Sequence, residues 1–364
     1  MTNTAENAVI GLPVNSDGCL GEGHVTLTGG HGGNALTGSP QQPSGPDALF
    51  SQAPITVAGE YVFAVNPGSN TLSMLKADCK NPALLTLVGQ PVQVPGEFPN
   101  TVAASLKNHL VCVGTTGRKA GISCASFGEH GLAVMDSLRP FDLNQTTPPT
   151  GPPNTVAQTF FSADESHLFT TVKGTPGTDA GFFSVFPVQG GFRPDTAATV
   201  ARQDVRSSFN GTALLFGSAV IPSSSHIFVT DPTFGVAVLN VNAKTNEATL
   251  LSRKPIAGQM ALCWAAYSSE RKSIFVIDAQ MNRFIELNAT DASVVSSVDL
   301  PNQDPGYIDV QAAGDIVYAL SPGNGTTEAS IVVYDSMKKK QVQHVSLKSK
   351  GADKNAVGMA YLQL

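Results

Sequence analysis

The chain repeats a module of four short β-strands, and this repeat is the feature that most limits its possible folds. One module, within residues 154–200, contains the runs VAQTFF, HLFTTV and GFFSVFPV, which are rich in β-branched and aromatic residues and are separated by turn sequences. The second strand of the module recurs near Tyr61, Leu110, Leu168, Ile227, Ile274 and Ile316. A period of roughly 40–60 residues is typical of β-propeller blades, because a single blade cannot bury its apolar face alone.

Six complete modules run from residue 54 to residue 347, and incomplete pieces remain at both chain ends. The first piece holds the strand-like runs AVIGLPV and HVTLT, and the last is the run VGMAYLQL. Joining these pieces in one composite blade closes the ring and removes the exposed strand edges. We therefore predict an all-β fold, a seven-bladed β-propeller of four-stranded antiparallel blades that forms one domain over residues 1–364. Residues 1–30 and 355–364 are expected to form the closing blade, in which only Met1–Asn3 stand where a second strand would end.

Composition restricts the elements and the partners of the chain. Charged residues make up 14%, which predicts few helices, because exposed helix faces are where Lys and Glu usually accumulate. The net charge of −6 leaves no basic footprint for nucleic acid, and no apolar run approaches membrane-spanning length. We expect a monomer that binds an organic small molecule and neither nucleic acid nor a membrane.

The first residues, MTNTAENAVIGL, have neither the basic start nor the apolar core of a signal peptide. The protein is therefore either intracellular or a secreted protein in its mature or truncated form. The five cysteines contain no C-x-x-C pair, so we expect no zinc site. Cys112 and Cys124 flank one long loop and are candidates for a disulfide, whereas Cys263 lies in an apolar strand and is expected to be a buried thiol.

Motifs for common cofactors fail in this sequence. The pattern Gly30-x-Gly32-x-x-Ala35 follows a strand, but the residues after it cannot form the helix that would hold a pyrophosphate. There is no Walker loop, no G-x-S-x-G elbow and no H-E-x-x-H motif. We expect neither a cofactor nor a metal.

The loops of one propeller face are the predicted site. In a propeller, the loops from the second to the third strand and from the fourth to the first strand share a face, and residues 29–52 are expected to form a long surface loop. Three cations in these loops could donate hydrogen bonds to a ligand oxygen, although each of them could instead be a surface cation with a local partner. These candidate catalytic residues are Lys173, Arg118 and Arg139. The predicted apolar walls are Phe98, Phe127 and Phe141.

Polar residues on or beside the first strands are a second group of candidates. Gln158, Gln259 and Asp309 would face the central channel, where they either bind the ligand or bond trapped water. His130, beside Glu129, is the best-placed general acid or base if the reaction needs proton transfer.

Several segments together resemble a known family. They are GPDALFSQ, VNPGSNTLSML, PGEFPNTVAAS, GISCASFG, RPFDLNQTTPPTGPPNTVAQTFFSADES and LFTTVKG. They resemble fungal secreted proteins described as 3-carboxymuconate-cyclase-like or lactonase-like seven-bladed β-propellers, a group in which we also suspect the hetero-Diels–Alderases of tropolone–sesquiterpene pathways. The resemblance implies a secreted, cofactor-free small-molecule cyclase of fungal secondary metabolism. The alternatives are a lactonase or lactonising enzyme of the carboxymuconate-cyclase type, and a non-catalytic secreted adhesin or surface antigen.

Overall fold

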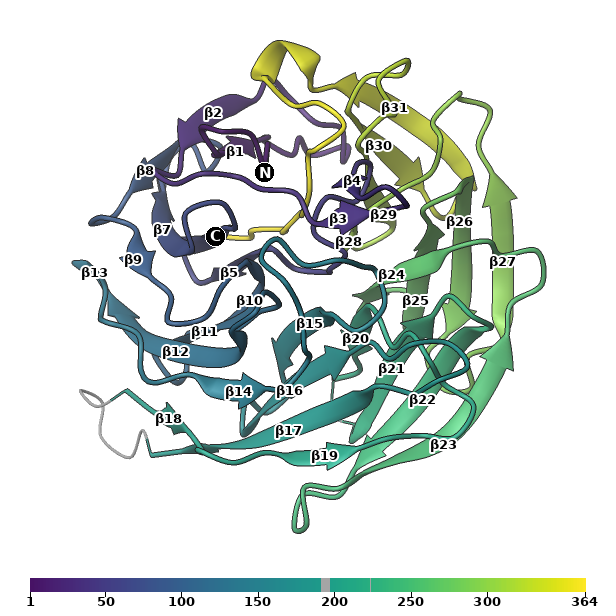
Figure 1. Ribbon diagram of the computed structural model, residues 1–364. Coiled ribbons are helices and arrows are strands. Elements are labelled where there is room, and N and C mark those ends of the chain that lie inside the picture. Colours follow the sequence, from purple (N-terminus) through teal and green to yellow (C-terminus); the bar gives the residue numbers. More distant parts are fainter. Residues whose placement is uncertain (191–196, 223) are drawn as a thin grey trace.

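The computed structural model describes residues 1–190, 197–222 and 224–364, and it is an all-β propeller with a single short helix, η1 (Lys348–Lys350), in this part of the chain (Figure 1). Six antiparallel sheets of four or five strands follow one another around a central axis. Blade 1 contains β5 (Ile55–Ala58), β6 (Tyr61–Asn66), β7 (Thr71–Ala77), β8 (Leu85–Leu87) and β9 (Val92–Gln93). Blade 2 contains β10 (Pro99–Ser105), β11 (Leu110–Thr115), β12 (Ala120–Gly128), β13 (Gly131–Leu132) and β14 (Arg139–Phe141). Blade 3 contains β15 (Val156–Phe161), β16 (His167–Val172), β17 (Phe182–Gln189), β18 (Thr199–Val200) and β19 (Val205–Ser207).

The other three blades have four strands each. Blade 4 contains β20 (Ser218–Val220), β21 (His226–Asp231), β22 (Gly235–Val241) and β23 (Ala248–Pro255). Blade 5 contains β24 (Leu262–Ser268), β25 (Ser273–Asp278), β26 (Met281–Asn288) and β27 (Val294–Asp299). Blade 6 contains β28 (Val310–Ala313), β29 (Ile316–Ser321), β30 (Ser330–Asp335) and β31 (Lys340–Ser346).

The burial pattern explains why the repeat is visible in the sequence. All residues of the central strands β6, β11 and β25 are buried, because both faces of each blade pack on a neighbouring blade. These strands are continuous apolar runs, as expected for strands that are covered on both faces. The outer strands β23 and β27 instead alternate between more and less exposed residues, because one of their faces meets water.

The prediction of seven blades was wrong, because the described residues form six. The sector between blade 6 and blade 1, here called the seventh sector, holds only the two-stranded hairpin of β1 (Ala8–Gly11) and β2 (His24–Leu27) together with residues 355–364, none of which forms a strand. The N-terminal amino group of Met1 donates to the carbonyl oxygen of Val357 at 2.9 Å, and the N–H of Thr2 donates to that of Ala8 at 2.9 Å. Met1–Asn3 thus link the C-terminal segment to β1, but three residues are too short to build a ladder between them.

The hairpin is bonded to both neighbouring blades. The N–H of Leu20 donates to Oε1 of Gln343 in blade 6 at 2.7 Å, and Oγ1 of Thr26 donates to the carbonyl oxygen of Leu85 in blade 1 at 3.2 Å. In Figure 1 the purple N-terminal segment and the yellow C-terminal segment run side by side in this sector.

Residues 44–53, which we call the plug, follow the small hairpin of β3 (Leu36–Thr37) and β4 (Gln42–Pro43) and lie at the axis of the ring. Figure 1 shows this hairpin near the centre. Gln52 bonds three blades at once: its N–H donates to Ala157 of blade 3, and its side-chain amide donates to the carbonyl oxygens of Ser218 in blade 4 and Ala265 in blade 5, all at 2.9–3.1 Å. The hydroxyl of Ser51 adds a bond of 2.6 Å to Asn100 of blade 2. The centre of the propeller is therefore filled by protein.

The predicted disulfide between Cys112 and Cys124 is confirmed, and the free thiol of Cys263 is buried as predicted. The two cysteines lie directly opposite each other on β11 and β12. No helix in the described part of the chain is long and apolar enough to cross a membrane.

Removal of the disulfide by the double change Cys112→Ala and Cys124→Ala is expected to lower the free energy of unfolding by about 3 kcal/mol, because the cross-link restricts the unfolded chain over 12 residues of separation. Urea denaturation measures the loss. Cys79→Ala, at an exposed free thiol, is the control and should leave stability unchanged. A loss below about 1 kcal/mol in the double variant would contradict this prediction.

Candidate functional site

A cavity of about 400 Å³ lies in the seventh sector. One wall is formed by residues 9–14 of the N-terminal hairpin, and the opposite wall is formed by residues 358–364 of the C-terminal segment. Blades 1 and 6 complete the walls with Ile55, Val57, Leu85, Gln311, Tyr318 and Leu320, among others. The cavity occupies the space between β1 and the C-terminal segment, and Met1 and Thr2 connect these two walls through backbone hydrogen bonds to Val357 and Ala8.

The lining of this cavity is almost entirely apolar, and it includes no Lys, Arg, His, Asp or Glu side chain. Two tyrosines and two glutamines supply its polar side-chain atoms. The rings of Tyr318 and Tyr361 stack at 6.5 Å with an angle of 11° between their planes. The hydroxyl of Tyr318 donates to the carbonyl oxygen of Gly18 at 2.8 Å, and burial raises the pKa of Tyr318 to about 12, so this phenol stays protonated. No hydrogen bond from the hydroxyl of Tyr361 is found within the described residues, which leaves this group able to meet a ligand.

Asp309 supports the cavity wall from behind. Its carboxylate accepts the N–H groups of Met359 and Val310, each at 2.8 Å, and Met359 lines the cavity. The amide of Gln311 donates to the carbonyl oxygen of Met359 at 3.0 Å, so blade 6 holds this residue on both sides. Burial raises the pKa of Asp309 to about 7, and the two N–H groups oppose this rise. Asp309, a predicted substrate-binding residue, thus does not line the cavity itself but bonds Met359, which does.

Lys173 lies in the axis of the ring, under the plug. Its side chain is 1% exposed, its Nζ donates to the carbonyl oxygen of Phe50 at 2.5 Å, and it sits 4.5 Å from the centre of the Phe216 ring. Burial lowers the pKa of this amine, and the nearby carboxylate of Asp47 opposes the shift. Lys173 therefore has a different environment from the other two cations that the sequence singled out.

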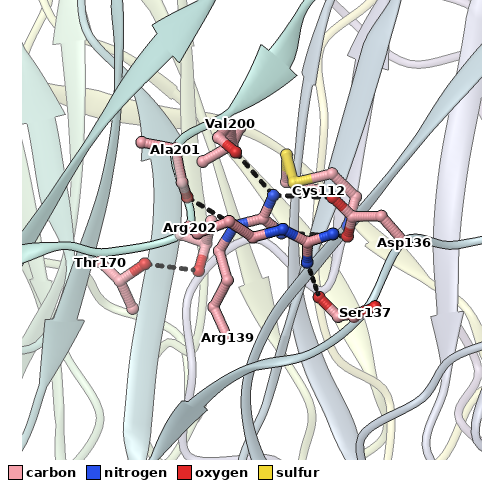
Figure 2. The surroundings of a disulfide bond; sticks show 10 residues. Cys112, Asp136, Ser137, Arg139, Thr170, Val200, Ala201 and Arg202 are labelled. Carbon is pink, nitrogen blue, oxygen red and sulfur yellow. Dashed lines mark hydrogen bonds and ion pairs between the residues drawn. A yellow bond between two sulfur atoms is a disulfide. The ribbon is translucent and has the colours of Figure 1, made fainter.

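Arg139 is buried beside the disulfide, as Figure 2 shows. Its guanidinium forms a two-pronged ion pair with Asp136, at 3.0 and 2.7 Å, and donates to the carbonyl oxygens of Val200 and Ala201, each at 2.7 Å. These acceptors engage all three guanidinium nitrogens. The geometry therefore favours a structural role, in which Arg139 joins blade 2 to blade 3.

Arg118 and His130 are exposed on loops of blade 2. The backbone N–H of Arg118 donates to Oγ1 of Thr147 at 2.9 Å, and the neighbouring Lys119 lies 3.9 Å from Glu97. Neither Arg118 nor His130 lines the seventh-sector cavity, so the structure does not bring them to this space.

The three predicted wall residues belong to the core between the blades. Phe127 packs edge-on against Phe63 at 4.8 Å, and Phe141 packs edge-on against Phe182 at 5.4 Å. Phe98 is 2% exposed. None of the three lines the cavity.

The two predicted glutamines bond the backbone of loops and neighbouring blades. Oε1 of Gln158 accepts the N–H of Ser218 at 2.6 Å, which joins blade 3 to blade 4. Gln259 donates to the carbonyl oxygen of Pro232 at 2.9 Å and accepts the N–H of Leu262 at 3.1 Å. Both amides therefore have protein partners rather than an open cavity before them.

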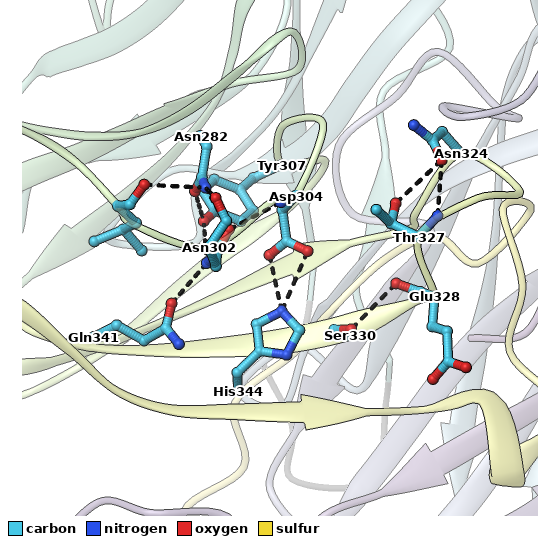
Figure 3. A network of polar contacts seen from close by, with 11 residues as sticks. Asn282, Asn302, Asp304, Tyr307, Asn324, Thr327, Glu328, Ser330, Gln341 and His344 are labelled. Atoms are coloured by element: carbon cyan, nitrogen blue, oxygen red, sulfur yellow. Dashed lines mark hydrogen bonds and ion pairs between the residues drawn. The ribbon is translucent and has the colours of Figure 1, made fainter.

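A polar network joins blades 5 and 6, as Figure 3 shows. The carboxylate of Asp304 accepts from Nε2 of His344 at 3.0 Å, and the amide of Asn302 donates to Gln341 at 2.6 Å. Because its members are bonded mainly to one another, the network positions the 301–307 loop. Within the described part of the chain, no group of three His, Cys, Asp or Glu residues could hold a metal ion.

Sequence reasoning missed Tyr318 and Tyr361 as lining residues, and it missed Asp47 near Lys173. Tyr361 lies in the last strand-like run, and Tyr318 lies in the second strand of blade 6, so their meeting follows from ring closure. The sequence contained one usable signal, which was the shortage of residues for a second strand in the closing blade.

Comparison with known proteins gives information about the fold. No family model matches the chain, and no curated protein matches its sequence. A putative 6-phosphogluconolactonase from Bacteroides fragilis has a similar structure, with a TM-score of 0.55 and 13% identity over 78% of this chain and 80% of that one. A chain of a nidogen–laminin complex is also similar, with a TM-score of 0.51 and 12% identity over 82% of this chain and 97% of that one. At these identities the comparisons show a shared fold, the β-propeller, which this chain has in common with a lactonase-like propeller.

Proposed function

We propose that the protein is a cofactor-free cyclase that binds an organic small molecule in the seventh-sector cavity and promotes its ring closure. The observation that carries the proposal is the cavity itself, whose 400 Å³ and apolar lining match the space that small-molecule sites usually offer. The substrate is therefore an uncharged and largely apolar compound. We place this activity in fungal secondary metabolism and in a secreted protein; the disulfide supports an oxidising compartment.

Ring closure of this kind suits a cavity without charged side chains. A hetero-Diels–Alder cycloaddition forms two σ bonds from π bonds, and no atom or proton leaves the reactants. The protein then has to hold two reacting parts in register, which contributes several kcal/mol. Tyr361 and Gln311 can donate hydrogen bonds to an oxygen on which charge develops. The active groups in this proposal are Tyr361, Gln311 and the apolar walls.

Binding is the first test. Ala360→Trp places an indole in the cavity from the half-buried C-terminal segment, and Ala180→Trp makes the same change at a half-buried loop position outside the cavity. We expect o-quinone methide precursors or phenolic terpenoids to raise the Tm of the wild type and of Ala180→Trp, and to leave that of Ala360→Trp unchanged. Product analysis by chiral chromatography then shows whether bound compounds cyclise. Equal shifts in all three proteins would place the ligand elsewhere and contradict the proposal.

The lactonase alternative is favoured by one observation, the fold shared with the 6-phosphogluconolactonase. Lactone hydrolysis needs an activated water, for which the exposed His130 and Glu129 are the available pair on the loops. His130→Ala should abolish lactone hydrolysis if this alternative holds, and should leave cyclisation in the cavity unchanged. Binding of none of these compounds would support the third possibility, a non-catalytic adhesin.

A further inference from the structure

The seventh sector lacks the strand that is most regular in the rest of the propeller. In each of the six blades the second strand has six residues, and every residue after the first is buried; these strands are β6, β11, β16, β21, β25 and β29. Each of them pairs with the first strand of its blade on one side and with the third strand on the other. Among the described residues of the seventh sector, Met1–Asn3 alone stand at this position, between β1 and the C-terminal segment. The cavity is therefore the place of a missing strand.

β1 has unpaired backbone groups on the side of this space. The N–H of Thr28 donates to the carbonyl oxygen of Asn7, next to β1, so Asn7 faces β2, and the backbone groups of successive residues in an antiparallel pair point to opposite sides. Ala8 and Ile10 therefore point toward the cavity. Ala8 is bonded there to Thr2, whose N–H it accepts at 2.9 Å and whose Oγ1 accepts its own N–H at 3.0 Å. Ile10, two residues further along β1, has no backbone partner on that side in the described part of the chain.

The opposite wall of the cavity has the same property. The amino group of Met1 donates to the carbonyl oxygen of Val357 at 2.9 Å, and the N–H of Val357 donates back to that of Met1 at 3.0 Å, as opposite residues of an antiparallel pair do. Residues 360–364 follow along this wall and line the cavity, and none of their backbone groups has a hydrogen-bond partner among the described residues. An extended chain in line with Met1–Asn3 would thus meet free backbone donors and acceptors on both sides.

The lining of the cavity defines the side chains that such an extended chain needs. Blade 1 contributes Val57 and Val62, and blade 6 contributes Tyr318 and Leu320, while no charged side chain lies in the lining. A strand in this place is covered on both faces, so it needs apolar residues at consecutive positions rather than at alternate ones. The second strands of the neighbouring blades have this pattern, with YVFAVN in β6 and IVYALS in β29. A charged side chain in the middle of the segment would be buried without a partner.

We propose that the seventh sector binds an extended apolar segment of another polypeptide, about six residues long, as the second strand of a seventh blade. The segment pairs with β1 on one side and with residues 360–364 on the other, and its side chains fill the cavity. The hydrogen bonds that Met1–Asn3 already make to both walls fix its line and its direction, which is antiparallel to each wall. This inference goes beyond the proposed cyclase, and the peptide and a small molecule compete for the same space.

The test uses a synthetic peptide with the β6 sequence YVFAVN, preceded by two lysines and a fluorophore that stay outside the cavity. Fluorescence anisotropy with the folded chain measures its binding. We expect saturable binding that weakens at least about ten-fold when two backbone amides of the peptide are N-methylated, because each methyl group removes a hydrogen bond. A peptide with the β27 sequence VVSSVD is the control of matched length. Half of its residues are polar, so it should also bind at least about ten-fold more weakly.

Two further readouts locate the bound peptide. Ala360→Trp, which fills the cavity, should abolish binding, and Ala180→Trp, outside the cavity, should bind the peptide as the wild type does. In the wild type, the peptide should slow hydrogen exchange at the amides of residues 360–364, because these groups gain hydrogen-bond partners. The exchange and N-methylation results need no variant, so they decide the question if Ala360→Trp does not fold.

The inference would be overturned by equal binding of the three peptides, by unchanged binding to a folded Ala360→Trp protein, by unprotected amides in residues 360–364, or by the absence of saturable binding. The outcome is separable from that of the cyclase proposal. A protein that cyclises none of the small molecules can still bind the peptide, and a protein that does not bind the peptide can still bind and cyclise a small molecule.

Discussion

The Arg139→Ala variant is expected to lose about 3 kcal/mol of unfolding free energy and to keep its activity per folded molecule. The side chain is 3% exposed and holds Asp136 as well as the carbonyl oxygens of Val200 and Ala201. Truncation removes the guanidinium donor from the carbonyl oxygens of Val200 and Ala201, and this is the main reason for the cost. Asp136 contributes less, because its carboxylate is partly exposed and still accepts the N–H of Cys124 at 2.8 Å. Urea denaturation measures the stability, and turnover normalised to the folded fraction measures the activity.

Arg118→Ala is the matched control, because it removes an exposed arginine from the same blade. Its stability should stay within about 0.5 kcal/mol of the wild type, as is usual for surface changes. A stable Arg139→Ala protein that has lost its activity would instead support the sequence-based hypothesis that Arg139 contacts the substrate.

The Asp309→Asn variant is expected to be more stable than the wild type at pH 8, by an amount that disappears on acidification. Burial raises the pKa of Asp309 to about 7, against about 3.9 for an unfolded aspartate. The folded protein therefore binds this proton more tightly than the unfolded chain does, and the wild type loses stability as the pH rises from about 4 to 7. At 1.36 kcal/mol for each pKa unit, this loss in the wild type is at most roughly 4 kcal/mol. The gain of the variant is smaller, because an asparagine amide has one acceptor oxygen, whereas the two oxygens of Asp309 accept the N–H groups of Val310 and Met359 separately.

Urea unfolding of both proteins at pH 4.5 and pH 8 measures this difference. Asp47 and the buried N-terminal amine are the other titratable groups that act on Asp309, and both are present in the two proteins compared. Asp299→Asn is the control with the opposite sign, because Arg283 lowers the pKa of that exposed carboxyl. Parallel pH profiles for the wild type and Asp309→Asn would refute the prediction.

The blades could be predicted from the sequence because each is built from neighbouring stretches of chain. The strands around Leu168, Ile227 and Ile274 are apolar runs that end in turn residues, and local propensity is enough to identify them. The number of blades could not be predicted in the same way. The repeat count predicts a strand at VGMAYLQL, but a strand needs a hydrogen-bonded partner strand. The neighbouring segment, Met1–Asn3, is too short to be that partner.

The site was harder to predict because its partners are distant in the sequence. Lys173 and Arg139 have the same charge, and the sequence predicts both in long loops, although Arg139 begins strand β14 in the structure. However, Lys173 bonds Phe50, 123 positions away, and Arg139 bonds Val200, 61 positions away. Whether a loop cation is free for a ligand depends on these tertiary partners, which no local pattern reports. The cavity arises from missing strand pairing, so no motif marks it.

The seventh sector has one more consequence, which concerns the order in which the ring opens. Each of the six blades closes loops of a few dozen residues at most, whereas the bond between Met1 and Val357 joins residues 356 positions apart. Loop-closure entropy is therefore concentrated in a single joint that only a few hydrogen bonds hold. The contact between the two chain ends is therefore expected to open locally while the six blades stay folded. A ligand could then enter or leave the neighbouring cavity without unfolding of any blade.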